Sequence, residues 1–309
     1  MGGIGVITNP RSRLNRRNPE LAERLAYVLG EKGALAAPSD LDALDAVAEN
    51  LRDREIDIVA INGGDGTNHA VLTALVRAYG ERPLPRIALL RGGTMNTVAS
   101  GLGINGTPTE LLGRLTSRYH REMPLAVVRR DLMLVNGLAG FLFGNGLISN
   151  WLEVYYEGSE PSPSKAAWLL LRSVASALVQ GPLVRRVVRP VRARVTLDGE
   201  PFPDRPWMTV AAGTVDDIGL GFRPFHRTVD HPGYLHAVAV GCTAPQLAGQ
   251  LWSMYRATGL KHPDIVEKLG KSLVIEADEP LGFMVDGDFH QGVRRVEVRL
   301  GPSVELIRL

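Results

Sequence analysis

The sequence predicts an α/β protein in which a Rossmann-like parallel sheet is followed by mainly antiparallel β structure. Three observations support this fold class. Strand and helix patterns alternate over residues 1–126, short strand-like runs dominate residues 127–302, and a glycine-rich turn follows the apolar run Ile56–Ile61. Alternation of strands with helices is typical of a parallel sheet that carries helices on its faces.

The N-terminal part contains three apolar runs with the length of buried strands, at residues 4–8, 56–61 and 86–90. Apolar residues at helical spacing predict four helices, at residues 19–30, 40–52, 67–79 and 107–118. Ser39 or Asp40 is a suitable N-cap for the second helix, because either side chain accepts a hydrogen bond from a backbone N–H group. Ligands of such sheets bind beyond the carboxyl ends of the strands, so we expect functional residues there.

The C-terminal part is predicted to be a set of short strands, many of them joined by tight turns. Asp198-Gly199 and Asp286-Gly287 are turn dipeptides of the kind that join antiparallel strands. Two helical stretches interrupt this pattern, near residues 164–180 and 244–257. The expected strands lie at residues 131–136, 139–145, 192–197, 207–212, 235–240, 273–276, 282–285 and 294–299.

Composition limits the class of protein. The chain has 309 residues, which suits two domains or one large one, and a net charge of +2, which is too small to indicate a nucleic-acid partner. Cys242 is the only cysteine, so an internal disulfide is excluded and a reducing compartment is expected. The start of the chain lacks the charged region of a signal peptide, and no apolar run reaches the length of about 20 residues that spans a bilayer. We therefore expect a cytoplasmic protein; the sequence leaves open whether it forms a homo-oligomer.

The glycine-rich turn at Gly63–Thr67 is the most informative motif. It lies between a predicted strand and a predicted helix that opens at Thr67, an arrangement in which backbone N–H groups and the helix N-terminus bind anions. Asp65 would repel a bare phosphate, but a metal ion that bridges its carboxylate to phosphates removes the conflict. The motif has neither the Lys-Ser/Thr pair of a Walker loop nor a dinucleotide fingerprint. It therefore indicates Mg-nucleotide binding of another kind.

Four motifs in the same order carry a resemblance to a known family. The string Gly63–Thr67 resembles the GGDGT signature of diacylglycerol, sphingosine, ceramide and NAD kinases. The chain is identified as a member of the diacylglycerol kinase catalytic-domain family because three further motifs match at family spacing. These are Asn9-Pro10 after the first strand, Gly93–Ala99 (GTMNTVA) after the strand at 86–90, and Val285–Asp288 (VDGD), which resembles the family's Asp-Gly-Glu.

The resemblance implies a nucleotide-binding α/β domain over residues 1–126, with an NAD kinase/diacylglycerol kinase-like sheet. It also implies a β-sandwich-like lipid-substrate domain over residues 127–302, a cleft between the two, and a tail at 303–309 that packs back on the first domain. The implied activity is transfer of the ATP γ-phosphate, with Mg²⁺, to the hydroxyl of a diacylglycerol-like or a sphingoid- or ceramide-like lipid.

Residue roles follow from the matched positions. The resemblance implies that Asp65 contacts the metal of the Mg-nucleotide, and that Asp286 is the general base, a role worth about 10²–10⁴ in rate. Asp288 stands where the family usually has Glu. Two simpler interpretations stay open, since Asn9 suits a turn before proline and Asp286-Gly287 suits a hairpin. The implied nucleotide-binding residues are Asn9, Gly63, Gly64, Asp65, Gly66, Thr67, Gly93, Thr94 and Asn96.

The chain departs from the family pattern at several positions. His69-Ala70 replaces the usual Asn-Glu after the GGDGT string, and His69 is a secondary candidate that resembles the His-Glu of sphingosine kinases. Bacterial relatives have a structural Mg²⁺ site at an Asp-Gly-Leu turn. Here Pro232 takes the place of that Asp, so Asp230 is at best a displaced ligand.

A peripheral membrane contact is expected in the second domain. The apolar patch Trp168–Leu171 precedes a basic cluster that includes Arg185, Arg186 and Arg189. An apolar anchor beside basic residues is typical of interfacial membrane binding. The alternative is a core helix followed by a strand with a solvated charged face.

Two other functions stay open from the residues. One is an NAD kinase-like enzyme that phosphorylates a ribose hydroxyl, and the other is a catalytically impaired lipid- or nucleotide-binding protein, which the changes at His69, Ala70 and Pro232 would permit.

Overall fold

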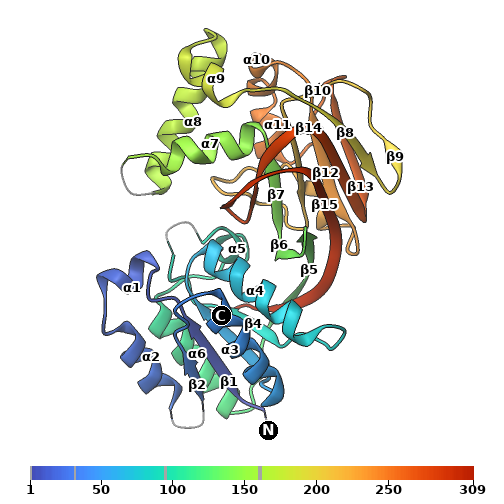
Figure 1. The fold of residues 1–309 in the computed structure, drawn as a ribbon. Helices are drawn as coiled ribbons and strands as arrows, with labels where there is room; N and C mark the ends of the chain where they lie inside the picture. The colour runs from blue at the N-terminus through green and yellow to red at the C-terminus, as the bar shows by residue number, and fades with distance from the viewer. Residues whose placement is uncertain (1, 31–32, 94–95, 159–161) are drawn as a thin grey trace. The chain divides into compact units, whose positions relative to one another are not determined.

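The structure is a computed structural model, and it describes residues 2–30, 33–93, 96–158 and 162–309 (Figure 1). The chain divides into two compact units. Unit 1 comprises Met1–Arg130 and Pro302–Leu309, and unit 2 comprises Asp131–Gly301. The two segments at which the chain passes from one unit to the other lie within β5 (Val127–Val135) and β15 (Asp288–Ile307).

Unit 1 is built on a parallel sheet with the strand order β2-β1-β3-β4. The strands are β1 (Ile4–Thr8), β2 (Ala34–Ala36), β3 (Ile58–Asn62) and β4 (Arg86–Leu89). Every residue of β1 and β3 is buried, which explains their almost continuous apolar sequences. The last part of β15 extends the sheet, because Leu306 pairs in parallel with Ile87 of β4.

Two pairs of helices cover this sheet, α2 with α6 and α3 with α4 (Figure 1). Their bounds are α2 (Leu21–Leu29), α3 (Leu41–Asp53), α4 (Asp65–Tyr79) and α6 (Pro108–His120), with the short helices α1 (Arg13–Arg17) and α5 (Thr97–Gly101) between them. The Asp40 side chain accepts a hydrogen bond from the Ala43 N–H group, so Asp40 rather than Ser39 is the N-cap of α3. Helix α4 begins at Asp65 and not at Thr67, because Gly64 is its N-cap.

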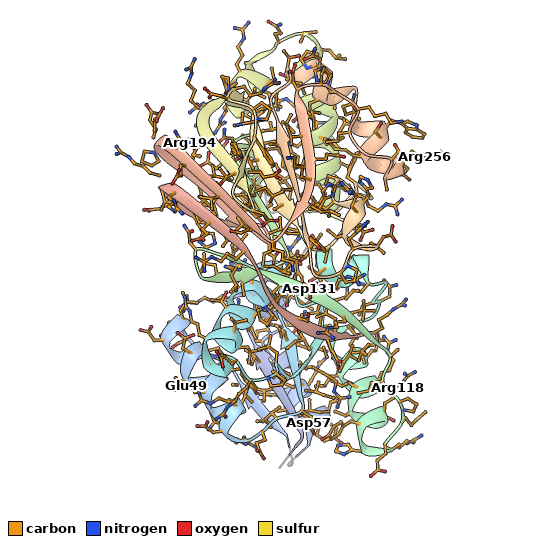
Figure 2. All side chains as sticks on the ribbon, turned by 90° about the vertical axis from the view of Figure 1, so that its right-hand side faces the viewer. Glu49, Asp57, Arg118, Asp131, Arg194 and Arg256 are labelled. Atoms are coloured by element: carbon orange, nitrogen blue, oxygen red, sulfur yellow. The ribbon has the colours of Figure 1, made fainter. Side chains whose placement is uncertain are left out.

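Two hydrogen bonds to Asp57 connect separate segments of the chain at the end of the sheet where the strands begin. Asp57 lies there, just before β3 (Figure 2). Its carboxylate accepts hydrogen bonds from the Gly3 N–H group at 2.9 Å and from the Tyr119 hydroxyl at 2.5 Å. The glycine turns lie at the opposite, carboxyl-end edge, since they follow β3 and β4.

Unit 2 is mainly antiparallel. Strand β14 (Ser272–Val285) pairs with β15, β7 and β8, and the order continues from β7 through β11 and β12 to β13. One apolar core lies between these strands, with Phe143, Trp207 and Val285 among its buried members. The remaining strands are β6 (Leu138–Gly140), β7 (Leu142–Asn145), β8 (Val191–Leu197), β9 (Glu200–Pro201), β10 (Pro206–Trp207), β11 (Thr209–Gly213), β12 (Leu235–Val240) and β13 (Ile265–Gly270).

The described part of unit 2 contains the α-helices α7 (Leu147–Tyr156), α8 (Pro163–Leu178), α9 (Pro182–Val187), α10 (Ala244–Ala248) and α11 (Leu251–Arg256), with a short 3-10 helix at His226–Thr228. The stretch 244–257, predicted as one helix, is two, because the chain turns at Gly249 and Gln250. Helices α7 and α9 were not predicted. Among the described residues, no helix is both long enough and apolar enough to cross a bilayer.

Candidate active site

The topology of unit 1 marks one point of the sheet as a ligand site. From β1 the chain crosses by α2 to β2 on one side, whereas from β3 it crosses by α4 to β4 on the other side. Ligands of open α/β sheets bind at the carboxyl ends of the strands where the direction reverses. Asn9 follows β1 there, and the Gly63–Thr67 turn follows the neighbouring β3.

The two glycine motifs form one surface, because their backbones touch. A Cβ atom on Gly93 would lie 2.2 Å from the Gly64 Cα atom, and one on Gly92 would lie 2.8 Å from the Gly63 nitrogen. These neighbours are backbone atoms and cannot rotate away, so only glycine fits. The turns after β3 and β4 therefore build a cradle of bare backbone at the N-terminus of α4. A cradle of this kind suits phosphate groups.

Asp65 links the two turns. It is the first residue of α4, and its Oδ2 atom accepts a hydrogen bond from the Thr97 N–H group at 3.0 Å. Thr97 is the first residue of α5, so one carboxylate lies at the N-termini of two helices. Both helix ends favour a negative charge. The interaction assigns Asp65 a positioning role that the sequence did not indicate.

Asn96 closes the second glycine turn. Its backbone is left-handed, with φ of 49°, and its side chain bonds Gly93 in both directions. The Gly93 N–H group donates to Asn96 Oδ1, and Asn96 Nδ2 donates to the Gly93 carbonyl, each at 3.1 Å. The predicted site residue Thr94, with Met95, lies outside the described residues.

A network of amides beneath the turns holds Asn9 in place. Asn9 Nδ2 donates to Thr67 Oγ1 at 2.9 Å, so the first and second motifs are joined directly. Asn9 Oδ1 also accepts from the Arg11 N–H group at 2.9 Å, as in an Asx turn, so the turn interpretation of Asn9 holds as well. Both roles are compatible, because they use different atoms of the amide.

Asn15 and Asn62 complete the network, and neither was predicted. Asn62 Nδ2 donates to Thr8 Oγ1 at 2.9 Å and to Asn15 Oδ1 at 3.0 Å. Asn62 is fully buried, and its Oδ1 atom has no hydrogen-bond partner among the described residues. A buried amide at the end of an otherwise apolar strand is costly unless it has a role. In the sequence, the signal for this residue was a polar side chain at the end of the apolar run Ile58–Asn62.

His69 is buried one turn into α4, with a side chain in the interior of unit 1. Gly66 and Thr67 also belong to α4, and a Cβ atom on Gly63 would lie 2.3 Å from the Thr67 Cβ atom. The close fit explains glycine at position 63.

Asp286 belongs to unit 2, where it forms a hairpin turn with Gly287. Both residues have positive φ, 48° and 88°, and they join β14 to β15 as in a type I′ turn. The hairpin interpretation is therefore correct for the backbone. The side chain makes contacts beyond the turn. Asp286 Oδ1 accepts hydrogen bonds from the Phe141 and Leu142 N–H groups at 2.9 and 2.8 Å.

Asp286 is buried, with only 5% of the residue exposed, and its carboxylate lies close to Gly140. A Cβ atom on Gly140 would lie 2.9 Å from Asp286 Oδ2, which selects glycine there. The carboxylate is thus fixed by the β6–β7 connection, far from it in sequence. Fixing a carboxylate in one orientation is what a general base requires.

The other candidates in unit 2 lie at the surface. Asp288 is exposed at the start of β15. Burial lowers the pKa of the neighbouring His290, and the charge of Asp288 opposes that shift. Asp230 is exposed, and in the next turn the Gly233 N–H group donates to Asp131 Oδ2 at 2.7 Å. The described residues contain no group of three or more His, Cys, Asp or Glu side chains that could hold a metal ion.

The predicted membrane residues lie on two helices. Trp168 and Leu171 of α8 are 60% and 71% exposed, so this helix does not bury its whole apolar face. Arg185 and Arg186 lie on α9 and Arg189 follows it, all exposed. Arg186 forms an ion pair with Glu157, so its charge is already partnered.

Comparison with known proteins agrees with the motifs. Residues 3–128 match the model of the diacylglycerol kinase catalytic domain, which confirms the family resemblance for this part of the chain. The matched residues make up most of unit 1. No curated protein sequence matches the chain significantly.

Solved structures confirm the predicted fold class. A candidate diacylglycerol kinase from Bacillus anthracis str. Sterne has a TM-score of 0.71 and 18% identity, with 99% of this chain and 97% of that chain covered. A second structure of a diacylglycerol kinase from the same organism has a TM-score of 0.66 at 18% identity, with the same coverage. Yeast NADH kinase, bound to NADH, has a TM-score of 0.52 at 10% identity and 99% and 83% coverage. At these identities the likeness concerns the fold alone.

Proposed function

We propose that the protein is a lipid kinase that transfers the γ-phosphate of ATP to the hydroxyl group of a diacylglycerol-like or sphingoid-like lipid. The observation that carries the proposal is the contact between the two glycine turns, with Asp65 between them, at the switch point of the sheet. The domain match over residues 3–128 supports a kinase in general.

Unit 1 would bind the nucleotide. The backbone N–H groups of Gly64 and Gly93 and the N-terminus of α4 provide a positive, Cβ-free surface for phosphate oxygens. Asn9 and Thr67 fix the edge of this surface. Asp65 is the carboxylate on which Mg²⁺ would be held, together with phosphate oxygens. The ion, when bound, neutralises charge on the transferring phosphoryl group.

Unit 2 would supply the base. As the lipid oxygen bonds to the γ-phosphorus, the bond from phosphorus to the bridging oxygen of ADP breaks, and the hydroxyl proton passes to the Asp286 carboxylate. Lipid hydroxyls have pKa values far above neutrality, so the proton leaves only as the new bond forms. The two backbone N–H groups that bond Asp286 Oδ1 orient the carboxylate for this transfer.

Membrane contact would bring the acceptor within reach. Trp168 and Leu171 offer exposed apolar surface, and Arg185 and Arg189 offer positive charges for an anionic bilayer. Arg186 contributes less to the proposed contact, since Glu157 is its partner.

The test is phosphate transfer from labelled ATP to diacylglycerol, sphingosine, ceramide and NAD in separate reactions. We expect a lipid product, and we expect Asp65→Asn and Asp286→Asn each to reduce turnover at least about 100-fold while the fold stays intact. Circular dichroism and thermal unfolding check the fold. Phosphorylation of NAD alone would support the NAD kinase-like alternative, and no product with any acceptor would support an impaired binding protein.

Each variant has a matched control. Asp198→Asn changes a second Asp-Gly turn of positive φ, in which Asp198 also accepts hydrogen bonds from two backbone N–H groups, those of Lys271 and Ser272. Asp40→Asn changes an N-cap carboxylate elsewhere in unit 1. Both controls should keep nearly normal turnover. Near-normal rates in the Asp65 or Asp286 variant would refute the role assigned to that residue.

A further inference from the structure

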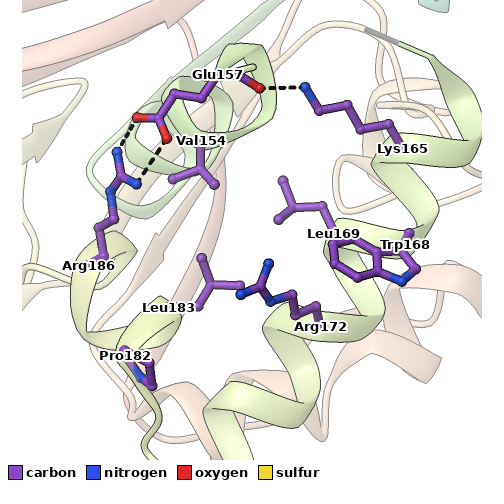
Figure 3. A pocket seen from close by; sticks show the side chains of 9 residues that line it. All are labelled: Val154, Glu157, Lys165, Trp168, Leu169, Arg172, Pro182, Leu183 and Arg186. Atoms are coloured by element: carbon purple, nitrogen blue, oxygen red, sulfur yellow. Dashed lines mark hydrogen bonds and ion pairs between the residues drawn. The ribbon is translucent and has the colours of Figure 1, made fainter. Parts of the chain in front are cut away.

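Unit 2 contains a pocket of about 490 Å³ that the proposed reaction does not use (Figure 3). Helices α7, α8 and α9 surround it. Its described lining combines apolar and basic side chains. The lining residues are Val154, Glu157, Lys165, Trp168, Leu169, Arg172, Pro182, Leu183 and Arg186.

Glu157 holds the three helices around this pocket. It is the C-cap of α7, and both of its carboxylate oxygens bond the Arg186 guanidinium of α9. Its backbone oxygen accepts a hydrogen bond from Lys165 Nζ of α8 at 2.8 Å. One residue thus ties α7 to both neighbours, and the pocket exists before any ligand arrives. A preformed pocket costs little ordering entropy on binding.

Arg172 is the cation that this arrangement leaves available. Its guanidinium lies 5.3 Å from the centre of the Trp168 ring and, among the described residues, has no ion-pair partner. In Figure 3 the guanidinium reaches toward Leu183, across the hollow from Glu157. The described lining carries three positive side chains and one negative one, Glu157. The pocket therefore favours an anionic group.

The same pocket offers apolar contacts next to that cation. Val154, Leu169 and Leu183 point into it from three different helices (Figure 3). Trp168, itself part of the lining, and Leu171 of the same helix are both exposed. A ligand that matches a cation beside aliphatic side chains has a negative head and a hydrocarbon chain.

We propose that this pocket binds one anionic phospholipid of the bilayer, with its phosphate on Arg172 and the first part of its acyl chain against Leu169 and Leu183. The exposed Trp168 and Leu171 lie in the interface beside it. The bound lipid is a docking ligand and is not phosphorylated. The inference goes beyond the proposed kinase activity, since it concerns binding in the absence of nucleotide.

The experiment measures co-sedimentation of the full chain with vesicles of phosphatidylcholine, with and without phosphatidylglycerol. It also titrates a short-chain phosphatidylglycerol below its micelle concentration, and glycerol 3-phosphate, by calorimetry. We expect saturable binding of one short-chain lipid per chain and no binding of glycerol 3-phosphate. Arg172→Gln should weaken vesicle binding about fivefold and abolish most of the calorimetric signal.

Arg256→Gln is the matched control. Arg256 lies over Trp252 on α11, at 5.7 Å, with the same spacing of four residues, and it is at the periphery of unit 2 in Figure 2. It does not line the pocket. We expect this variant to bind the short-chain lipid like the unmodified protein.

A second variant tests the apolar contact. Leu183→Asn keeps every charge. It should weaken binding of the short-chain lipid as much as Arg172→Gln does. Equal losses in the Arg172 and Arg256 variants would overturn the proposal, because they would indicate general surface charge. Binding of glycerol 3-phosphate as tight as that of the lipid would also overturn it, in favour of a free-phosphate site.

Discussion

At the residue scale, the candidate nucleotide site depends on glycines, which have no Cβ atom. Gly63, Gly64, Gly92 and Gly93 allow two turns to meet at backbone distance, and side-chain amides then lock them. The glycines were visible in the sequence, but their mutual contact was not. Asn62 was not predicted either, because the signal that it gives, a polar residue at the end of an apolar strand, also resembles the start of a loop.

Gly93→Ala tests this contact. The new methyl group would lie 2.2 Å from the Gly64 Cα atom, so the turns must separate. We expect a loss of about 1–3 kcal/mol in the free energy of unfolding and at least about tenfold weaker nucleotide binding, measured by urea denaturation and with a fluorescent ATP analogue. Gly113→Ala is the control, since its nearest neighbour is a Val28 methyl group at 4.0 Å and alanine suits its helix. Equal nucleotide binding by both variants would contradict the cradle.

At the element scale, long apolar patterns were predictable and short elements were not. The apolar runs of β1, β3 and β4 were predicted within two residues of their bounds. Strand β2 was missed because Ala34–Ala36 is too short for a pattern, and α7 because its apolar and aromatic residues suit a strand equally well. Strand β13 was missed as well, since Ile265–Gly270 alternates only weakly.

Partners distant in sequence were also beyond prediction. The turn at Asp286 was expected from Asp-Gly alone, but the N–H groups of Phe141 and Leu142 that hold its carboxylate lie more than a hundred residues away. Only the fold of β6, β7 and β14 brings them together. Sequence reasoning therefore gave the candidate chemistry, and the structure gave the groups that orient it.

The clamp between α7 and α9 leads to a prediction at this scale. Glu157→Gln removes the charge that holds Arg186, yet both side chains are about half exposed, so the free energy of unfolding should hardly change. Local motion should change more, because α9 has only six residues. We expect faster hydrogen exchange over residues 182–187, measured by mass spectrometry.

Glu200→Gln is the control for that measurement. It removes an exposed ion pair with Lys268 in the same unit, far from α9 in the chain. Exchange over residues 182–187 should stay unchanged in this variant. Unchanged exchange in Glu157→Gln as well would show that the ion pair does not hold the pocket helices.

At the scale of the whole molecule, acid stability depends on a buried histidine. Burial lowers the pKa of His236 to about 3, and the charges of His226 and Arg227 act in the same direction. The folded protein keeps this ring neutral, whereas the unfolded chain protonates it near pH 6.5. Stability from His236 is therefore lost as pH falls below about 6.5, at up to about 1.4 kcal/mol per pH unit.

Glu267 acts in the opposite direction, because burial raises its pKa. Its contribution to the free energy of unfolding is present below the ordinary pKa of 4.5 and is lost as pH rises through the raised value.

The His236 effect can be tested by urea unfolding between about pH 7 and pH 5. We expect the stability of the unmodified protein to fall over this range, and a flatter profile in His236→Leu. A profile that is equally steep in this variant would exclude His236 as the cause.

The path of β15 has a consequence for synthesis. Residues 302–309 belong to unit 1, where Leu306 pairs with β4 and the Arg308 N–H group bonds the Ala126 carbonyl, although all of unit 2 precedes them in the chain. A ribosome makes the first part of unit 1 long before it makes the strand that borders β4. Until translation passes residue 309, this sheet keeps an open edge beside β4, which a chaperone or a neighbouring nascent chain can pair with.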